Sequence, residues 1–228
     1  PWWSPPSHRK QAMPTQLKID FVSDVSCPWC AIGLGALQQA AARLGDEVKL
    51  DMHFQPFELN PDMGAEGQDV VEHLSEKYGI SAEQIKQNGE AIRARGEAVG
   101  FAFNMDKRAR IYNTFDAHRL LHWAGLKGRQ LALKQALFAA YFTDGENPSQ
   151  HALLVRLAGE VGLDADEAAE VLASDRYAAD VRAMQQRYLQ SGVRAVPAVI
   201  VNDRHLIQGG QPAEVFEQAL RQIAAGEV

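Results

Sequence analysis

The stretch LKIDFVSDVSCPWCAIGLGALQQAAARLG, residues 17–45, decides the fold of this chain. Apolar and polar side chains alternate from Leu17 to Phe21, which predicts a β-strand. Apolar residues at helical spacing then run up to Gly45, which predicts an α-helix. The segment VKLDMHF, residues 48–54, predicts a second strand. Together these elements predict a β-α-β unit with parallel strands and a right-handed crossover.

The middle of the chain, residues 68–190, is helical in pattern almost throughout. Ser81 is expected to cap one helix, with Gln84 at the capping-box position. Asn113 or Thr114 is expected to cap another helix. The spacing of apolar residues predicts helices over residues 69–78, 115–122, 129–143, 153–161, 165–173 and 177–189.

Strand patterns return near the end of the chain. Residues 196–202 form a short β-branched run, Asn202-Asp203 predicts a turn, and residues 205–208 predict its hairpin partner. Pro212 is expected to be the first residue of a final helix.

The predicted order is β-α-β, a long helical block and then β-β-α, an α/β arrangement. It is that of a thioredoxin-like fold with a large all-helical insertion. We place the thioredoxin-like domain at residues 17–63 and 191–228, and the helical insertion domain at residues 64–190. Residues 1–16 contain four of the ten prolines and no apolar period, which predicts a disordered tail.

Composition excludes two classes of partner. The 228 residues carry a net charge of −6 and no run of Lys and Arg, whereas nucleic-acid binding needs a basic surface. No apolar run approaches the roughly 18 residues of a membrane span. We therefore expect no nucleic acid and no membrane among the partners, and the oligomeric state stays open.

The start of the chain bears on its compartment. No apolar segment follows Arg9 and Lys10, as it would in a secretory signal. Met13 suits a natural start, in which case residues 1–12 are a cloning remnant or a misassigned start. We therefore expect a cytoplasmic protein, in which a Cys-x-x-Cys pair is more often catalytic or metal-binding than a static crosslink.

Cys27 and Cys30 are the only cysteines of the chain, and they lie where a predicted strand gives way to a predicted helix. Pro28 suits the first helical turn, because its missing N–H would be unpaired there. Cys27 is then at the helix N-terminus, where free N–H groups and the helix dipole favour a thiolate. We predict that Cys27 attacks a disulfide and that Cys30, one turn further on, resolves the mixed disulfide.

Two other interpretations of the pair are a zinc half-site and two inert core thiols. Zinc would need about two further ligands, and His118 and His122 have a metal-like i, i+4 spacing. Such a pair on a helix is more often one packed and one solvated residue, so we predict no metal. Asp24 either relays protons for Cys30 or caps the turn.

Substrate contacts are expected on both sides of the cysteines. Pro28 and Trp29 lie between them, and Trp29 either flanks the disulfide or packs on the helical insertion. Val196-Pro197 opens a strand, where a proline is tolerated, and an X-Pro bond is also the usual place for a cis peptide. A cis-proline loop beside the cysteines would leave the backbone of Val196 free to pair with an extended substrate.

Six short segments, by their order and spacing, carry a family resemblance: SCPWC (26–30), QPFELNP (55–61), YNT (112–114), AHRL (117–120), GVRAVP (192–197) and GGQP (209–212). They resemble the DsbA-like branch of the thioredoxin superfamily, most closely the FrnE-like proteins, over nearly all of residues 17–225. The resemblance implies thiol–disulfide oxidoreductase or isomerase activity, a cis proline at Pro197 and a helical domain over the active site. It also places Asn113 and His118 in the cleft, although His118 equally suits a packed helix position.

The chain departs from the family pattern at three places. Arg194 and Ala195 stand in place of a tighter Gly-Val-Pro-like run, and Gly210 stands where alanine is more usual. We interpret these changes as drift that does not touch the chemistry. Trp29 stands where DsbA has a histidine that can donate to the thiolate, which predicts a less oxidising couple than that of DsbA.

Kappa-class glutathione transferases and hydroxychromene-carboxylate isomerases share this inserted fold, but they typically have serine at the position of Cys27. We therefore predict a cytoplasmic dithiol–disulfide oxidoreductase or isomerase that acts on protein or small-molecule disulfides. No resident cofactor is expected, and glutathione is a candidate co-substrate. Two hypotheses stay beside it: a glutathione-dependent isomerase or transferase, and a non-enzymatic redox sensor or holdase.

Overall fold

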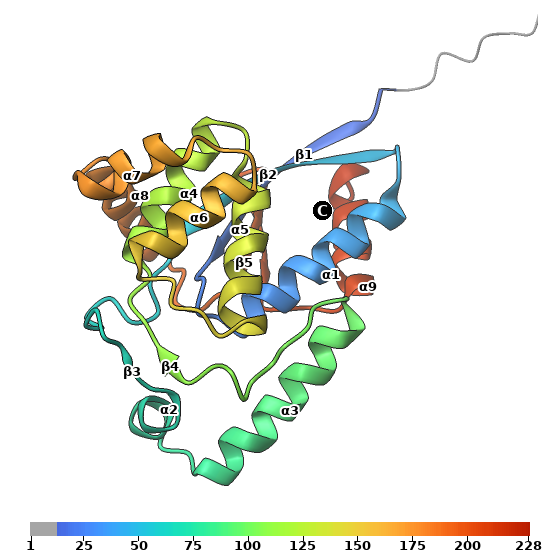
Figure 1. Cartoon of the computed structure of the whole chain (residues 1–228). Helices are drawn as coiled ribbons and strands as arrows, with labels where there is room; N and C mark the ends of the chain where they lie inside the picture. Colours follow the sequence, from blue (N-terminus) through green and yellow to red (C-terminus); the bar gives the residue numbers. More distant parts are fainter. Residues whose placement is uncertain (1–12) are drawn as a thin grey trace, which may run out of the picture.

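A four-stranded sheet in the order β2-β1-β5-β6 forms the centre of the structure (Figure 1). The computed structural model describes residues 13–228. The expected tail over residues 1–16 therefore falls mostly outside the described residues. Strand β1, Thr15–Ser23, begins two residues before the strand that the sequence pattern predicts.

The first half of the sheet is the predicted β-α-β unit. Strand β1 pairs in parallel with β2, Val48–Pro56, from Thr15 opposite Val48 to Ser23 opposite Pro56. Helix α1, Pro28–Leu44, makes the connection. Parallel pairing requires such a crossover, and the prediction of this unit is confirmed.

The second half of the sheet comes from the C-terminal end of the chain. Strand β5, Ala198–Val201, pairs antiparallel with β1 and with β6, His205–Gln208. The turn between β5 and β6 has positive φ at Asn202 and Asp203, 53° and 57°, which is the backbone that suits a tight hairpin. Helix α9, Ala213–Ala224, follows, with Pro212 as its N-cap rather than its first residue.

Between the two halves lies the expected helical insertion. Its helices are α2 (Val70–Tyr78), α3 (Ala82–Ala98), α4 (Phe115–Leu126), α5 (Gln130–Phe138), a π-helix (Ala139–Thr143), α6 (His151–Glu160), α7 (Ala165–Ala173) and α8 (Ala178–Gln190). Ser81 caps α3 as predicted, because its side chain accepts from the amide of Gln84. A small sheet of β3 (Gln68–Asp69) and β4 (Arg110–Ile111) was not predicted, since two-residue strands carry no periodic signal.

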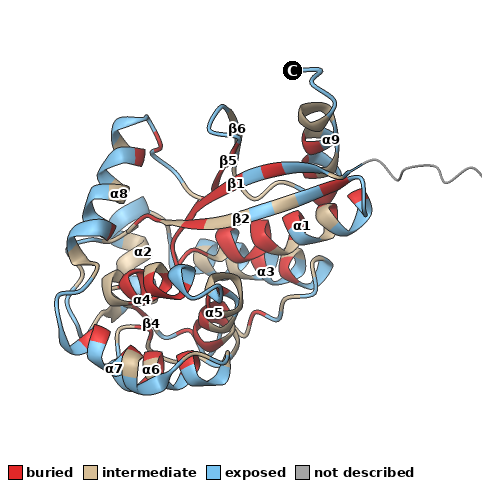
Figure 2. Ribbon diagram, turned by 90° about the horizontal axis from the view of Figure 1, so that it is seen from above, coloured by how far each residue is buried: buried red, intermediate tan, exposed pale blue. Residues whose placement is uncertain are grey.

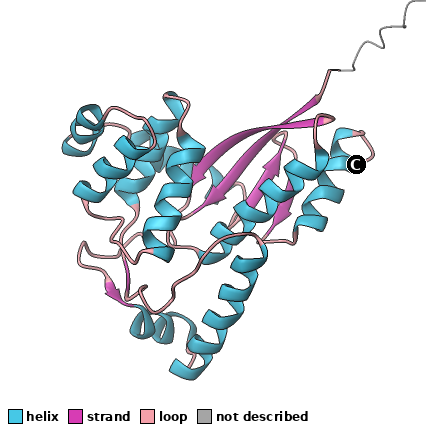
Figure 3. Cartoon of the chain, turned by 45° about the vertical axis from the view of Figure 1, so that its right-hand side comes forward, coloured by secondary structure: helices cyan, strands magenta, loops and turns pink. Residues whose placement is uncertain are grey.

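The core is divided between the sheet and the insertion. Leu17, Ile19 and Phe21 of β1 are buried against α1 and α9, whereas Val22 packs on the opposite side with Tyr188 of α8. Side chains that alternate along a strand reach both faces of the sheet, and both faces of β1 are covered (Figure 2). Helices α4 to α7 enclose a second buried cluster, and Figure 3 shows them gathered at one side of the strands.

Candidate active site

The first turn of α1 holds the two cysteines. Cys27 is the N-cap of α1, with extended backbone at φ −93° and ψ 111°, and Pro28 occupies the first helical turn. The Sγ of Cys27 accepts a hydrogen bond from the amide of Cys30 at 3.2 Å. Cys27 therefore lies at the N-terminus of α1, the end of the helix dipole that attracts negative charge.

The two sulfurs differ in their surroundings. Both cysteines are free thiols; Cys27 is 4% exposed, and Cys30 is completely buried. The pKa of the Cys30 thiol is raised well above its usual range. Burial is the largest cause, followed by the hydrogen bond with Cys27 and the charge of Cys27. This raised pKa favours the protonated thiol of Cys30 at neutral pH.

The loop before β5 lies against Cys27. Its Sγ is 3.8 Å from the carbonyl oxygen of Val196, and the Val196–Pro197 peptide bond is cis. The carbonyl of Pro197 accepts from the amide of Gly209 at 2.8 Å and from the side chain of Gln208 at 3.1 Å. The structure thus brings Cys27, Val196 and Pro197 together, and Val196 is only partly buried.

Trp29 is the exposed residue of this turn, at 37%. The guanidinium of Arg95 lies 5.4 Å from the centre of its ring and also donates to the carbonyl of Gly210 at 3.1 Å. The interpretation of Gly210 as drift away from the chemistry is wrong. A Cβ at Gly210 would lie 2.9 Å from the carbonyl oxygen of Trp29, so a glycine is needed where this loop meets the Cys-Pro-Trp-Cys turn.

Asp24 joins this turn to the insertion. Its Oδ1 accepts from the hydroxyl of Thr114 at 2.7 Å and from the Nε2 of His118 at 3.0 Å. Its Oδ2 accepts from the hydroxyl of Ser26 at 3.2 Å and from the amide of Leu59 at 2.8 Å. Burial acts to raise the pKa of Asp24, but the donors, led by His118, hold it below its ordinary value. Asp24 is therefore kept as a carboxylate that fixes the turn, and it is a poor proton acceptor for Cys30.

Neither Asn113 nor His118 is hydrogen-bonded to a cysteine within residues 13–228. His118 is 3% exposed and faces Asp24. Asn113 accepts from the amide of Phe115 through its side chain, so Asn113 rather than Thr114 provides the side-chain cap of α4.

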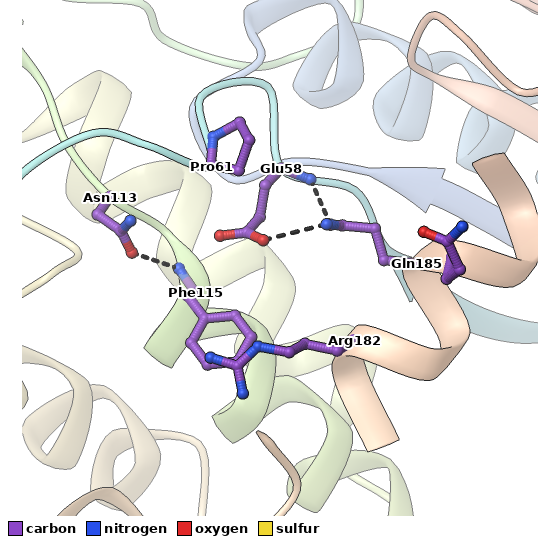
Figure 4. A pocket seen from close by; sticks show the side chains of 7 residues that line it. Glu58, Pro61, Asn113, Phe115, Arg182 and Gln185 are labelled. Carbon is purple, nitrogen blue, oxygen red and sulfur yellow. Dashed lines mark hydrogen bonds between the residues drawn. The ribbon is translucent and has the colours of Figure 1, made fainter. Parts of the chain in front are cut away.

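Asn113 lines a cavity of about 450 Å³, shown in Figure 4. The guanidinium of Arg182 lies over the ring of Phe115 at 4.4 Å, and the side chain of Gln185 donates to Glu58 at 3.1 Å. Burial raises the pKa of Glu58, and the hydrogen bond from Gln185 partly offsets this effect. Neither cysteine lines this cavity; its lining residues are Glu58, Pro61, Asn113, Phe115, Arg182, Gln185 and Gln186.

The sequence analysis missed two cations that the structure buries. Arg108 donates to the carbonyl of Ser26 at 3.4 Å and lies over the ring of Tyr141. Lys134 is 1% exposed and its Nζ lies over the ring of Phe138. Lys134 falls within the apolar stripe of α5, which was the available signal that its side chain enters the interior.

Within residues 13–228, no group of at least three His, Cys, Asp or Glu side chains is placed to hold a metal ion. In the same part of the chain, no helix is long and apolar enough to cross a membrane.

The sequence and this geometry agree with one family. Residues 18–221 match the profile of the DSBA-like thioredoxin domain. The chain belongs to the DsbA-like thioredoxin family. A probable DsbA oxidoreductase of Streptomyces coelicolor shares 36% identity with this DsbA-like chain at a TM-score of 0.86, covering 93% of this chain and 91% of that one. The thioredoxin-like fold with its helical insertion is therefore confirmed.

Two further relatives extend the comparison of this DsbA-like chain. The Bacillus subtilis protein YwbO is 28% identical over 204 residues, which are 89% of this chain and 94% of YwbO. The cytosolic disulfide reductase DsbM of Pseudomonas aeruginosa, solved with GSH, has a TM-score of 0.65 and 17% identity, covering 91% of this chain and 99% of that one. At that identity the likeness to DsbM shows the shared fold.

Proposed function

We propose that this DsbA-like protein is a dithiol–disulfide oxidoreductase or isomerase in which Cys27 is the attacking thiol and Cys30 the resolving thiol. The observation that carries the proposal is the unequal environment of the two sulfurs. Cys27 is the N-cap of α1, and its Sγ accepts a hydrogen bond from the amide of Cys30. Cys30, by contrast, is buried, and the pKa of its thiol is raised. One sulfur thus lies at a helix N-terminus with a backbone donor, and the other is buried as a thiol.

In the first step, the Cys27 thiolate attacks one sulfur of a substrate disulfide, and the other substrate sulfur leaves as a thiolate. The amide of Cys30 already donates to the attacking sulfur at 3.2 Å. Val196 offers backbone groups beside this sulfur for an extended substrate, because its amide donates to no protein group within residues 13–228. Pro28 and Trp29 provide the opposite side of the substrate site. Pro28 is partly buried, and Trp29 is exposed.

In the second step, Cys30 attacks the Sγ of Cys27, the Cys27–Cys30 disulfide forms, and the second substrate sulfur leaves with the proton of Cys30. The reverse sequence of steps transfers a disulfide to a substrate. Glutathione is our proposed co-substrate for resetting the pair, and the cytoplasm our proposed compartment. Both proposals are supported by the fold shared with DsbM, which is itself a cytosolic disulfide reductase solved with GSH.

Reduction of insulin by dithiothreitol or glutathione tests the proposal in the wild type, Cys27→Ser and Cys30→Ser. The wild type is expected to accelerate the reaction, and Cys27→Ser to abolish the acceleration. Glutathione binding by a folded wild type that does not reduce insulin would instead support a glutathione-dependent isomerase or transferase. Full cellular function in Cys27→Ser would support a sensor or holdase.

A further inference from the structure

A positive charge from the helical insertion lies against the exposed residue of the Cys-Pro-Trp-Cys turn. The guanidinium of Arg95 is 5.4 Å from the centre of the Trp29 ring, and it donates to the carbonyl of Gly210 at 3.1 Å. Trp29 is 37% exposed, and Arg95 is only partly buried. A substrate that contacts Trp29 on this side of the turn therefore meets the charge of Arg95.

The packing of α3 on α1 holds Arg95 in this place. Val99 is four residues after Arg95 and so lies on the same side of the chain. Its side chain lies against α1, where a Cβ at Gly35 would come within 2.8 Å of it. The side chain of Gln39 donates to the carbonyl of Ala98 at 3.1 Å, and Figure 1 shows this end of α3 beside α1. The guanidinium is thus positioned before a substrate binds, which lowers the entropic cost of binding.

The loop that accepts this hydrogen bond borders the site of exchange. A Cβ at Gly33 of α1 would lie 3.5 Å from the Cα of Gly210 and 3.2 Å from the Cγ of Pro197. Pro197 follows Val196, whose carbonyl oxygen is 3.8 Å from the Sγ of Cys27. Gly210 and the guanidinium bound to it therefore lie on the same side of α1 as the cis-proline loop that contacts the reacting sulfur.

The charge of Arg95 has no acidic partner in the described part of the chain. No carboxylate of residues 13–228 lies within ion-pair distance of its guanidinium. Arg93 on the same helix, by contrast, pairs with Glu90 at 3.4 Å and with Glu97 at 3.2 Å. A guanidinium has several N–H donors in one plane, and the hydrogen bond to Gly210 uses only one nitrogen. The other donors suit a carboxylate, which a guanidinium can bind through both oxygens.

We propose that Arg95 makes the protein selective for small disulfides that carry a carboxylate. The guanidinium binds the carboxylate while Cys27 forms a bond to one substrate sulfur and the substrate S–S bond breaks. Cys30 then displaces the bound half of the substrate. The cysteine pair is oxidised to its disulfide, the substrate is reduced to two thiols, and the two cysteine protons end on those thiols. The proposal rests on the proposed exchange cycle and names a substrate class for it.

A set of disulfides with similar length and different charge tests the proposal. 3,3′-Dithiodipropionate is anionic, bis(2-hydroxyethyl) disulfide is neutral and cystamine is cationic at neutral pH. Acid quenching, alkylation of the remaining thiols and mass spectrometry measure the rate at which each disulfide oxidises the reduced protein. The disulfides differ in their own reactivity, so each is compared with itself on wild type and variant.

Arg95→Gln removes the charge and keeps an amide that can donate to Gly210. We expect the rate with dithiodipropionate to fall about tenfold relative to the rate with the neutral disulfide, because a charge-assisted hydrogen bond is lost. The relative rate with cystamine should rise. Arg95→Lys, which keeps the charge, should retain part of the preference. Arg93→Gln is the matched control, because it removes an exposed charge of the same helix and should leave the relative rates unchanged.

Salt provides a second measurement on the wild type alone, in case Arg95→Gln does not fold. Sodium chloride at about 1 M should lower the relative rate of the anionic disulfide, because it screens the charge of Arg95. An equal change for all disulfides in Arg95→Gln, or relative rates that salt does not alter, would overturn the role of Arg95 and leave the exchange cycle in place. A wild type that reacts with none of the disulfides would overturn the cycle, and the role of Arg95 with it.

Discussion

The Nε2 of His118 lies 3.0 Å from the Oδ1 of Asp24, with side-chain exposures of 2% and 1%. His118 belongs to α4 of the insertion, and Asp24 precedes the Cys-Pro-Trp-Cys turn. A carboxylate only accepts hydrogen bonds, so the Nε2 of His118 carries the proton in this pair. The contact fixes the helical insertion to the turn that holds Cys27.

Asp24→Asn should lower the free energy of unfolding by about 3 kcal/mol at pH 7, because it removes one member of a buried hydrogen-bonded pair. Thr114 and Leu59 would also lose a charged acceptor. Urea denaturation of the two proteins measures the difference. A change below about 0.5 kcal/mol, the usual range for surface substitutions, would contradict this account of Asp24.

The same pair predicts a pH dependence. The pKa of Asp24 is lower in the folded protein than its ordinary value of 3.8. Its contribution to stability is therefore complete above that value, and it is lost as the pH falls through 3.8 and then through the lower native pKa. The stability difference between wild type and Asp24→Asn should shrink over this acid range. Denaturation curves that keep a constant separation down to pH 2 would argue against it.

Gly210→Ala should lower the free energy of unfolding by about 1–3 kcal/mol, the usual cost of overpacking. The new Cβ would lie 2.9 Å from the backbone carbonyl of Trp29, which cannot move without shifting the Cys27 turn. Gly89→Ala is the matched control, because its nearest neighbour is a side-chain atom of Met105 at 3.9 Å in the interior of α3. The control should be neutral or more stable by up to about 1 kcal/mol. Equal effects of the two substitutions would contradict the prediction.

Trp29→His should make the Cys27–Cys30 couple more oxidising. Its reduction potential should rise by about 30 mV for each tenfold change in the equilibrium constant. An imidazolium between the cysteines can stabilise the Cys27 thiolate, which the indole ring does not do. Equilibration with reduced and oxidised glutathione measures the reduction potential of wild type and Trp29→His. Trp29→Phe serves as a control whose side chain has no hydrogen-bond donor. A wild-type potential equal to that of DsbA, or no rise in Trp29→His, would reject this explanation.

Iodoacetamide at neutral pH should modify Cys27 and leave Cys30 intact in the reduced, folded protein. Cys30 is completely buried, and its pKa is raised well above the usual range. Mass spectrometry of the peptides counts the modified sulfurs, and denatured protein provides the control in which both react. Equal modification of the two cysteines in the folded protein would contradict the assigned difference between them.

The sequence was most informative where the signal is local. Three signals depend only on neighbouring residues: the alternation from Leu17 to Phe21, the Cys-x-x-Cys spacing and the Asn202-Asp203 turn. The strand, the helix and the hairpin turn that they predict are all present. The π-helix over Ala139–Thr143 was predicted as ordinary helix, because a local widening of a helix leaves the apolar period almost unchanged.

The contacts that organise the site were not accessible in this way. His118 is 94 residues from Asp24 along the chain, and the two meet only after the insertion packs on the sheet. Lys134 is a charged residue in an apolar stripe, and its burial depends on the same packing. Sequence patterns predict elements, whereas partners of buried polar groups depend on the tertiary fold.

Trapping with oxidised glutathione distinguishes an attacking Cys27 from a resolving Cys30. Reduced Cys30→Ser should accumulate one glutathione in a disulfide with Cys27, visible as a mass increase located to the Cys27 peptide. Reduced Cys27→Ser should gain none, and the wild type should pass to the Cys27–Cys30 disulfide with no lasting adduct. A stable adduct on Cys30 of Cys27→Ser, with none on Cys27 of Cys30→Ser, would contradict the account.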